Sequence, residues 1–311
     1  RMEHLEARWP LLALDLSRDK LFVEKVSFYQ QSMLITCLGR LRLFDEDVYR
    51  NVAELLLSDF GLFKEVEDLA PVLWAYAMVG YFHPQLFEGA YDQMIDWFEA
   101  ETINAKSRKT REALIQIVWS FGLAGFHRRH ESFAAFLDYA LFGDAADLRS
   151  LHLRRLAQLA DAVIEESPET LPRCQYPERL AAARADQRVR QLVSSDPVSE
   201  PSLLQEVRSA LQELGWPHET FFMPDDTSAF YVDVSLTPKV GHKVGLLLAG
   251  RYELAQVGLP SEAKPSRESG PLQLARRLLA HRGWRTAVLS REEWAAASSL
   301  EERKAVLEDA L

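Results

Sequence analysis

An eight-residue pattern that recurs along the first half of the chain limits its fold more than any other feature. The segment 74–81, Trp-Ala-Tyr-Ala-Met-Val-Gly-Tyr, matches 119–126, Trp-Ser-Phe-Gly-Leu-Ala-Gly-Phe, 45 residues later. A weaker copy occupies 36–43, 38 residues before the first, and has Arg42 where the other two copies have glycine. Self-similarity at such a period is typical of proteins built from repeated helical pairs.

The residues around these copies follow the spacing of amphipathic helices. Apolar side chains recur at steps of three and four, as at Val48 and Val52 or at Phe133 and Leu137. We therefore expect residues 1–193 to form an α-solenoid of about four helical hairpins, in which each hairpin buries its apolar face only by stacking on a neighbour. An ordinary helical bundle with accidental internal similarity is the alternative.

A polar segment with two prolines, residues 194–202, follows the helical region. Proline has no backbone N–H and cannot continue a helix, so we expect this segment to link two domains. Ser202 can then cap a helix that ends at Gly215. The expected organisation is a helical repeat domain at 1–193, a linker at 194–202 and a second domain at 203–311.

The second domain carries an ordered set of sequence marks. They are an Asp-bearing strand at 231–236, an apolar strand at 244–250 that ends in glycine, a Gly-x-x-x-Leu-x-x-Arg helix from Gly270, the pair Gly283-Trp284, a further strand and Trp294. Together these marks resemble the RAP domain, a small α/β module at the C-terminus of organellar RNA-handling proteins. The resemblance covers 201–311. The helical periods resemble, more loosely, the degenerate heptatricopeptide and octotricopeptide repeats that precede RAP domains.

The RAP resemblance implies a fold similar to that of restriction endonucleases, whose active sites hold a divalent metal between clustered carboxylates. Asp233 stands where the first of these carboxylates is found. Leu247, Ala249 and Glu253 occupy positions where RAP proteins commonly have Glu, Asp and His. A single carboxylate cannot hold a catalytic Mg²⁺. We therefore expect no enzyme activity, no metal and no cofactor, with Asp233 accepting a backbone N–H or pairing with an arginine.

Charge is distributed unevenly along the chain. Residues 1–100 carry 9 Lys and Arg against 17 Asp and Glu, a net charge of −8, whereas residues 101–200 carry 14 of each. Phosphate neutralisation dominates nucleic-acid affinity, so the acidic balance argues against strong RNA binding by this chain alone. We expect residues 1–100 to contact neighbouring proteins.

Basic clusters provide the candidate RNA contacts in the helical region. The densest cluster enters a repeat helix, and a second occupies the turn after that helix. If repeat loops share one edge, these charges form a stripe that follows an RNA backbone. Solvated loops without a ligand are the alternative. The candidates are Lys106, Arg108, Lys109, Arg111, Arg128, Arg129, Arg154 and Arg155.

A separate basic cluster lies in the second domain, around the helix that begins at Gly270. It consists of Arg276, Arg277, Arg282 and Arg285. These residues are expected to bind phosphates, with backbone N–H groups offered at Gly270. In the alternative interpretation they form a solvated helix face, and their positive charges interact favourably with the negative C-terminal end of the helix dipole.

Other residue types exclude further kinds of site. Trp284 and Trp294 can stack on bases, but we expect both to be core residues, because large aromatic side chains beside apolar strands are usually buried. Cys37 and Cys174 lie far apart and predict free thiols. No apolar run approaches the roughly 20 residues of a membrane span, so we expect no membrane partner.

The resemblance implies a location in the mitochondrial matrix or, as the alternative, in a plastid. The acidic balance and the short repeat array favour a subunit of a stable RNA–protein particle. Our leading interpretation is a non-catalytic RNA-binding protein, a lineage-specific subunit of the mitochondrial ribosome that holds ribosomal RNA fragments. A free factor for RNA processing or stability, a structural protein–protein scaffold in a mitochondrial complex and, least favoured, a nuclease are the alternatives.

Overall fold

The structure is a computed structural model, and its contacts divide the chain into two compact units. Unit 1 comprises Arg1–Leu148, Glu169–Tyr176 and Leu254–Gln273, and unit 2 comprises Arg149–Pro168, Pro177–Glu253 and Leu274–Leu311. The residues that the structure describes are 14–15, 17–19, 25–104, 107–128, 132–142, 148–186, 189, 201–222, 230, 232–236, 243–249, 254–258 and 265–310.

The units interleave along the chain and differ from the expected ranges 1–193 and 203–311. Segment 254–273 packs within unit 1, and segment 149–168 packs within unit 2. Segment 254–273 belongs to unit 1 because its strands pair there, and segment 149–168 belongs to unit 2 because its carboxylates form ion pairs there, as described below. Most of the expected linker, residues 194–200, lies outside the described residues, so a domain boundary there stays a prediction.

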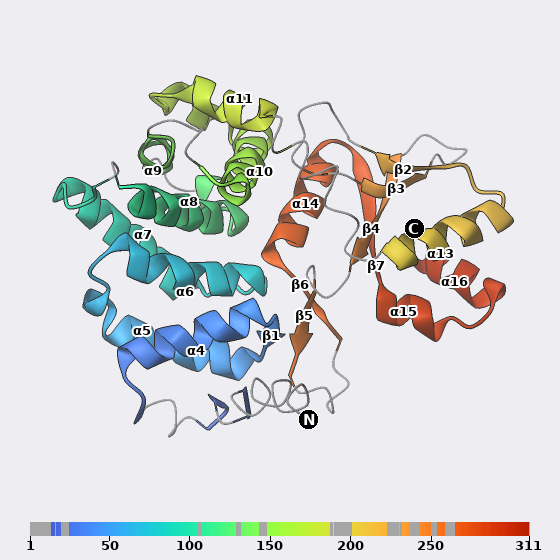
Figure 1. The fold of residues 1–311 in the computed structure, drawn as a ribbon, viewed down its shortest axis with the longest axis horizontal. Helices are drawn as coiled ribbons and strands as arrows, with labels where there is room; N and C mark the ends of the chain where they lie inside the picture. The colour runs from blue at the N-terminus through green and yellow to red at the C-terminus, as the bar shows by residue number, and fades with distance from the viewer. Residues whose placement is uncertain are drawn as a thin grey trace. The chain divides into compact units, whose positions relative to one another are not determined.

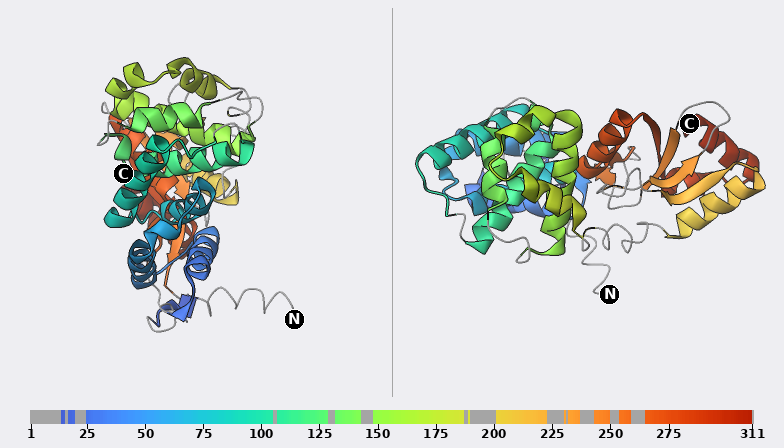
Figure 2. Two further views of the ribbon diagram at one scale, coloured as in Figure 1. Left: turned by 90° about the vertical axis from the view of Figure 1, so that its left-hand side faces the viewer. Right: turned by 90° about the horizontal axis from the view of Figure 1, so that it is seen from above.

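Unit 1 is mainly helical, as the apolar spacing predicted. Helix α4 packs against α6 and α6 against α8, while α5 packs on α4 and α7, and α9 packs on α8. Figure 1 shows this order, and the turned view in Figure 2 shows it again. The elements are α4 (Phe28–Arg40), α5 (Glu46–Ser58), η1 (Phe60–Leu62), α6 (Val66–Met78), α7 (Pro84–Glu99), α8 (Arg108–Leu123), η2 (Phe126–Arg128) and α9 (Phe133–Ala140).

The three copies of the sequence repeat contain the C-terminal ends of α4, α6 and α8. At the glycine position of the repeat the backbone turns to a positive φ in every copy, 66° at Gly80, 82° at Gly125 and 56° at Arg42. Glycine adopts this conformation freely, whereas an L side chain is strained there. The repeat therefore encodes one helix-ending turn three times, and Arg42 keeps the turn without the glycine.

Small and aromatic residues of the repeat bring α4 and α6 together. A Cβ atom added at Gly39 would lie 2.6 Å from the Cβ atom of Ala75. The buried hydroxyl of Tyr76 donates a hydrogen bond to the carbonyl oxygen of Tyr49 at 2.7 Å. Burial raises the pKa of both tyrosines well above the ordinary value, so both stay neutral hydrogen-bond donors.

A small sheet belongs to unit 1. It has the order β1 (Leu43–Phe44), β5 (Leu254–Val257), β6 (Arg267–Glu268), with β1 parallel to β5 and β5 antiparallel to β6. The backbone N–H of Gln256 donates to the carbonyl oxygen of Arg42 at 2.8 Å, and that of Gly258 donates to Phe44 at 2.7 Å. These bonds attach segment 254–273 to the turn that ends α4.

Unit 2 contains a mixed sheet of the order β2, β3, β4, β7. The first two pairings are antiparallel and the pairing of β4 with β7 is parallel, so the chain must cross over between them. Helix α14 lies in this crossover. The elements are α10 (Ser150–Glu166), α11 (Pro177–Ala185), α13 (Pro201–Glu213), β2 (His218–Phe222), β3 (Val232–Leu236), β4 (Lys243–Ala249), α14 (Gly270–His281), β7 (Trp284–Ser290), α15 (Arg291–Ala296) and α16 (Leu300–Ala310). Helix α14 belongs to this unit from Leu274 onward, and the 3-10 helix η4 (Pro168–Arg173) belongs to unit 1 from Glu169 onward.

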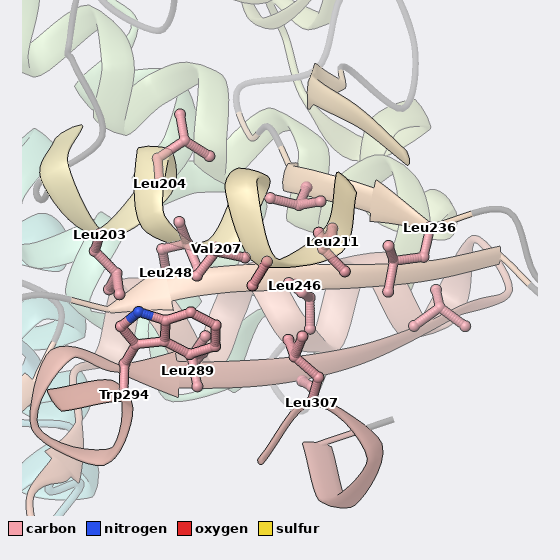
Figure 3. Close-up of a cluster of buried hydrophobic side chains, with 14 residues drawn as sticks. Leu203, Leu204, Val207, Leu211, Leu236, Leu246, Leu248, Leu289, Trp294 and Leu307 are labelled. Atoms are coloured by element: carbon pink, nitrogen blue, oxygen red, sulfur yellow. The ribbon is translucent and has the colours of Figure 1, made fainter. Parts of the chain in front are cut away.

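The sheet of unit 2 buries one face under α13. Leu203, Val207 and Leu211 of the helix are fully buried, and Figure 3 shows them over Leu246 and Leu248 of β4. Burying each such side chain stabilises the fold by about 1.5–3 kcal/mol.

Trp284 and Trp294 are core residues, as the sequence predicted. They are only 4% and 1% exposed. The indole N–H of Trp294 donates to the Glu206 carboxylate at 3.1 Å, which satisfies its one polar atom. Neither ring is available to stack on a base.

Candidate nucleic-acid interface

Asp233, the residue that the RAP resemblance aligned with a nuclease carboxylate, has a structural role. Asp233 is 6% exposed, and its carboxylate oxygen Oδ2 accepts the backbone N–H of Leu248 at 2.7 Å. This hydrogen bond confirms the expectation that Asp233 accepts a backbone N–H group. Leu247 and Ala249 are buried apolar residues where a metal centre needs oxygen ligands. Within the described part of the chain, no group of three His, Cys, Asp or Glu residues could hold a metal, and Glu253 lies outside that part.

The N-terminus of α14 is not the phosphate site that the sequence suggested. Gly270 is buried, and a Cβ atom there would lie 2.3 Å from the carbonyl oxygen of Ala77 at the end of α6. The Ser269 hydroxyl also accepts the backbone N–H of Leu272, at 3.4 Å. The glycine therefore serves a close approach between two helix ends, and that approach leaves no room for a phosphate.

Arg277 and Arg282 also require a correction, because both are used in ion pairs inside unit 2. Arg277 Nε donates to Glu166 Oε1 at 2.6 Å, and Arg282 Nε donates to Glu165 Oε1 at 3.0 Å. Arg282 Nη2 lies 3.7 Å from Asp161 Oδ1. The side chains of Asp161 and Glu166 are fully buried, so these arginines neutralise carboxylates of α10 instead of phosphates.

The remaining basic candidates of unit 2 differ in exposure. Arg155 is 7% exposed, and this burial removes it from an RNA surface. Arg154 and Arg276 are half-buried, and Arg285 is exposed. Arg184 of α11, which the sequence did not single out, donates to Asp161 at 2.7 Å and joins the ion-pair cluster.

The first turn of α8 presents a mixed set of basic side chains. Arg111 is 6% exposed, and its Nη1 donates to the carbonyl oxygen of Phe142 at 2.9 Å. Arg108 is exposed and pairs with Glu112 at 3.1 Å. Lys109 is exposed. Arg111 thus fixes the chain after α9, and Lys109 is the best placed of the three for a phosphate contact.

The described members of the two basic clusters of the helical region lie at opposite ends of α8. Arg108 begins α8, whereas the exposed Arg128 lies in the 3-10 turn after α8 ends. A helix of 16 residues separates them, which corresponds to about 24 Å. Lys106 and Arg129 lie outside the described residues. The expectation of a shared edge is wrong for Arg108 and Arg128, because one helix places them at its opposite ends.

No protein-family model matches this chain, and no curated protein matches it significantly. A candidate interface must therefore be argued from the side chains themselves. A search of the described helices finds none that is long and apolar enough to span a membrane.

Two exposed aromatic residues at the end of α9 were missed by the sequence reasoning. Tyr139 is 37% exposed and Phe142 is 40% exposed. Their signal lies in the helical spacing, because Phe133, Phe136 and Leu137 form the buried stripe of α9 and Tyr139 falls outside it. An aromatic residue outside the apolar stripe of a helix is a candidate contact residue.

Proposed function

We propose that this chain is a non-catalytic RNA-binding protein in which an α-solenoid is combined with a RAP-like α/β domain of endonuclease-like topology. The observation that carries the proposal is the use of Asp233 to accept the Leu248 N–H group, beside the apolar residues Leu247 and Ala249. A RAP-like order of strands and helix without oxygen ligands suits binding and not hydrolysis. The stacking of α4, α6 and α8, each ending in the same turn, supports the solenoid.

The proposed setting is a ribonucleoprotein particle, most specifically a lineage-specific mitochondrial ribosome whose ribosomal RNA is fragmented. The resemblance to RAP proteins supports the mitochondrial matrix, with a plastid as the alternative location. Several arginines serve the fold, as Arg277 and Arg282 do, and few remain for phosphates. Binding within a particle needs fewer phosphate contacts than binding to free RNA, because neighbouring subunits hold the same RNA.

A protein–protein scaffold is the second candidate, and the surface of α4 favours it. Tyr29 is 71% exposed and Met33 is 49% exposed, one helical turn apart on α4. Residues 1–100 also carry the net charge of −8. An acidic surface with apolar side chains suits a protein partner better than RNA.

Ultraviolet crosslinking in intact mitochondria, followed by recovery of the full chain and sequencing of the attached RNA, tests the proposal. We expect crosslinks to one or a few organellar RNAs. Purified full chain should bind labelled RNA at low salt, with an affinity that falls as salt rises. Recovery of protein neighbours alone, with no RNA crosslinks and no binding at low salt, would favour the scaffold.

A further inference from the structure

Helix α4 lies at one end of the row that α4, α6 and α8 form in unit 1 (Figure 1). The copies of the repeat are offset by 38 and 45 residues, so Cys37 of α4 holds the position of Ala75 in α6 and of Ser120 in α8. Ala75 and Ser120 are fully buried, whereas Cys37 is exposed. One position of the repeat is therefore covered in two helices and open in the third.

In α6 and α8 the preceding helix of the row contacts this face. Ala75 of α6 packs against Gly39 of α4, where an added Cβ atom would lie 2.6 Å from the Ala75 Cβ atom. The side-chain amide of Gln116 in α8 donates to a backbone carbonyl oxygen of α6 at 3.0 Å. Gln116 holds the repeat position of Met33 in α4. The positions of Met33 and Cys37 thus belong to the face on which α6 and α8 each contact the preceding helix.

The corresponding face of α4 is an exposed apolar stripe. Tyr29 is 71% exposed, and Met33 and Leu41 are each 49% exposed, with Cys37 between them. Steps of four residues place these side chains on one side of the helix, over about 18 Å. Single exposed apolar side chains are common, but a contiguous row of them marks an interaction surface. We call Tyr29, Met33, Cys37 and Leu41 the α4 stripe.

We propose that the α4 stripe binds an amphipathic helix of a partner protein, which packs on α4 as α4 itself packs on α6. The occupant follows from the repeat, because a helix covers the same face in α6 and in α8. The chemistry of the partner follows from α4, which presents Gly39 to Ala75 next to the buried residues Ile35 and Leu38. The partner helix should therefore carry a small residue opposite Cys37, beside large apolar residues, because a small residue allows two backbones to approach closely.

Charge argues against RNA and against a second copy of this chain as the occupant. Arg40 is the only charged residue of α4, and residues 25–70 carry 5 Lys and Arg against 8 Asp and Glu, a net charge of −3. This balance repels phosphates, and two chains of net charge −10 repel each other. The inference adds a protein-docking surface to the proposed RNA-binding function and does not depend on it.

Photocrosslinking of the full chain tests the occupant. Replacing Tyr29 by p-benzoylphenylalanine keeps an aromatic side chain at the end of the stripe, and the same replacement at the exposed Tyr139 of α9 is the matched control. After irradiation in an extract of the cells that produce the protein, mass spectrometry should find a partner peptide on the Tyr29 variant that is absent from the control. That peptide should have helical apolar spacing with a glycine or alanine among its apolar residues.

Binding in solution then separates docking from chance capture. A labelled synthetic peptide of the crosslinked sequence should bind the purified full chain in fluorescence anisotropy. Met33→Lys puts a charge into the stripe and should weaken this binding about tenfold or more, as expected when one buried Met side chain is lost. Tyr139→Lys adds the same charge to α9 and should have no effect. Met33→Leu keeps the apolar contact and should bind as tightly as the wild-type chain.

A crosslink to anything other than a partner helix would overturn the inference. A second copy of this chain, another segment of the same chain or RNA attached to the Tyr29 variant would each identify a different occupant. No crosslink beyond those of the control, or equal binding of the peptide to Met33→Lys and to the wild-type chain, would show that the stripe is not a docking surface. A crosslinked peptide without a small residue would contradict the analogy with α4 and α6. RNA affinity is measured separately on the same variants, so a failure of the stripe leaves the proposed function standing.

Discussion

The guanidinium of Arg267 donates two hydrogen bonds to the carbonyl oxygen of Gly80, from Nε at 3.2 Å and from Nη2 at 2.8 Å, across 187 positions of sequence. The amide of Gln273 donates to the same oxygen at 3.3 Å. The guanidinium also lies over the rings of Phe44 and Tyr81, 4.9 and 5.6 Å from their centroids. The turn that ends α6 thereby holds segment 254–273 in unit 1.

Gly80→Ala and Gly125→Ala form a matched pair that tests this attachment. Both glycines have positive φ, so alanine should cost about 1–2 kcal/mol at either position. A Cβ atom at Gly80 would also lie 2.2 Å from the Glu268 carbonyl oxygen, whereas one at Gly125 would meet nothing within 4 Å. We therefore expect Gly80→Ala to lower the free energy of unfolding in urea clearly more. Equal losses would show that segment 254–273 does not pack on Gly80.

Removing the Arg277 side chain should destabilise unit 2 without changing the affinity for RNA. Arg277→Ala takes the guanidinium away from the fully buried Glu166 carboxylate. We expect a loss of about 2 kcal/mol, less than for a fully buried ion pair, because Arg277 is partly exposed. The double variant Arg277→Met, Glu166→Leu should recover most of this loss. Arg285→Ala, at an exposed position, is the control for charge alone. A lower salt slope of RNA binding in Arg277→Ala would restore this residue to the interface.

His83 should make stability depend on pH. Its Nδ1 atom accepts the backbone N–H of Leu86 at 3.3 Å and caps α7, which requires the neutral ring. Burial lowers the pKa of His83, against an opposing effect of the Glu54 carboxylate. The unfolded chain therefore binds the proton more readily, and stability should fall as the pH drops below about 6.5.

His83→Asn is the test of that cap. Asparagine does not titrate and can cap the helix at any pH in this range. The stability of the variant should therefore fall less between about pH 7 and pH 5 than the stability of the wild-type chain. Urea unfolding at a series of pH values measures the difference. An identical pH profile in the variant would assign the decrease to other groups.

The two cysteines should differ in reactivity. Cys37 is exposed, whereas Cys174 is buried and its thiol donates to the Thr170 carbonyl oxygen at 3.5 Å. Burial raises the pKa of Cys174 to about 11, with a further contribution from Asp138, so its reactive thiolate is scarce at pH 8. Iodoacetamide at pH 8 followed by peptide mass spectrometry should find Cys37 modified first. Equal labelling of the folded chain would contradict the burial of Cys174.

Asp233→Ala should affect stability and no reaction. The substitution leaves the Leu248 N–H group without the carboxylate that accepts it, which should cost about 1–3 kcal/mol. Wild-type chain incubated with single- and double-stranded nucleic acids plus Mg²⁺ or Mn²⁺ should cleave neither. Cleavage that disappears in Asp233→Ala would identify a nuclease.

Structural features that depend on residues close together in the sequence could be predicted from local patterns. The apolar spacing predicted the helices, and the recurring glycines of the repeat, Gly80 and Gly125, coincide with the turns that the structure shows after α6 and α8. The Asp233 hydrogen bond was also expected, but the expectation came from the RAP resemblance, which leaves Leu247 and Ala249 where acidic metal ligands would stand.

Long-range partners could not be predicted in the same way. Strands β1 and β6 have two residues each, too few to carry an alternating pattern. The sequence shows that Arg277 is basic but not that Glu166 lies beside it, since 111 positions separate them. The exposure of Tyr139 and Phe142 was missed for a related reason, because an aromatic residue in or beside an apolar helix is first interpreted as core.

The pairing of β1 with β5 also determines when unit 1 can complete its fold during synthesis of the chain. The turn of Arg42 emerges from the ribosome more than 200 residues before Gln256, whose N–H group it accepts. At about 5–20 residues per second, translation needs roughly 10–40 seconds to cover that interval. During this time the rings of Phe44 and Tyr81 lack the guanidinium that later covers them. Unit 1 can therefore complete its fold only late in synthesis. We expect chaperones to bind its early helices before that point.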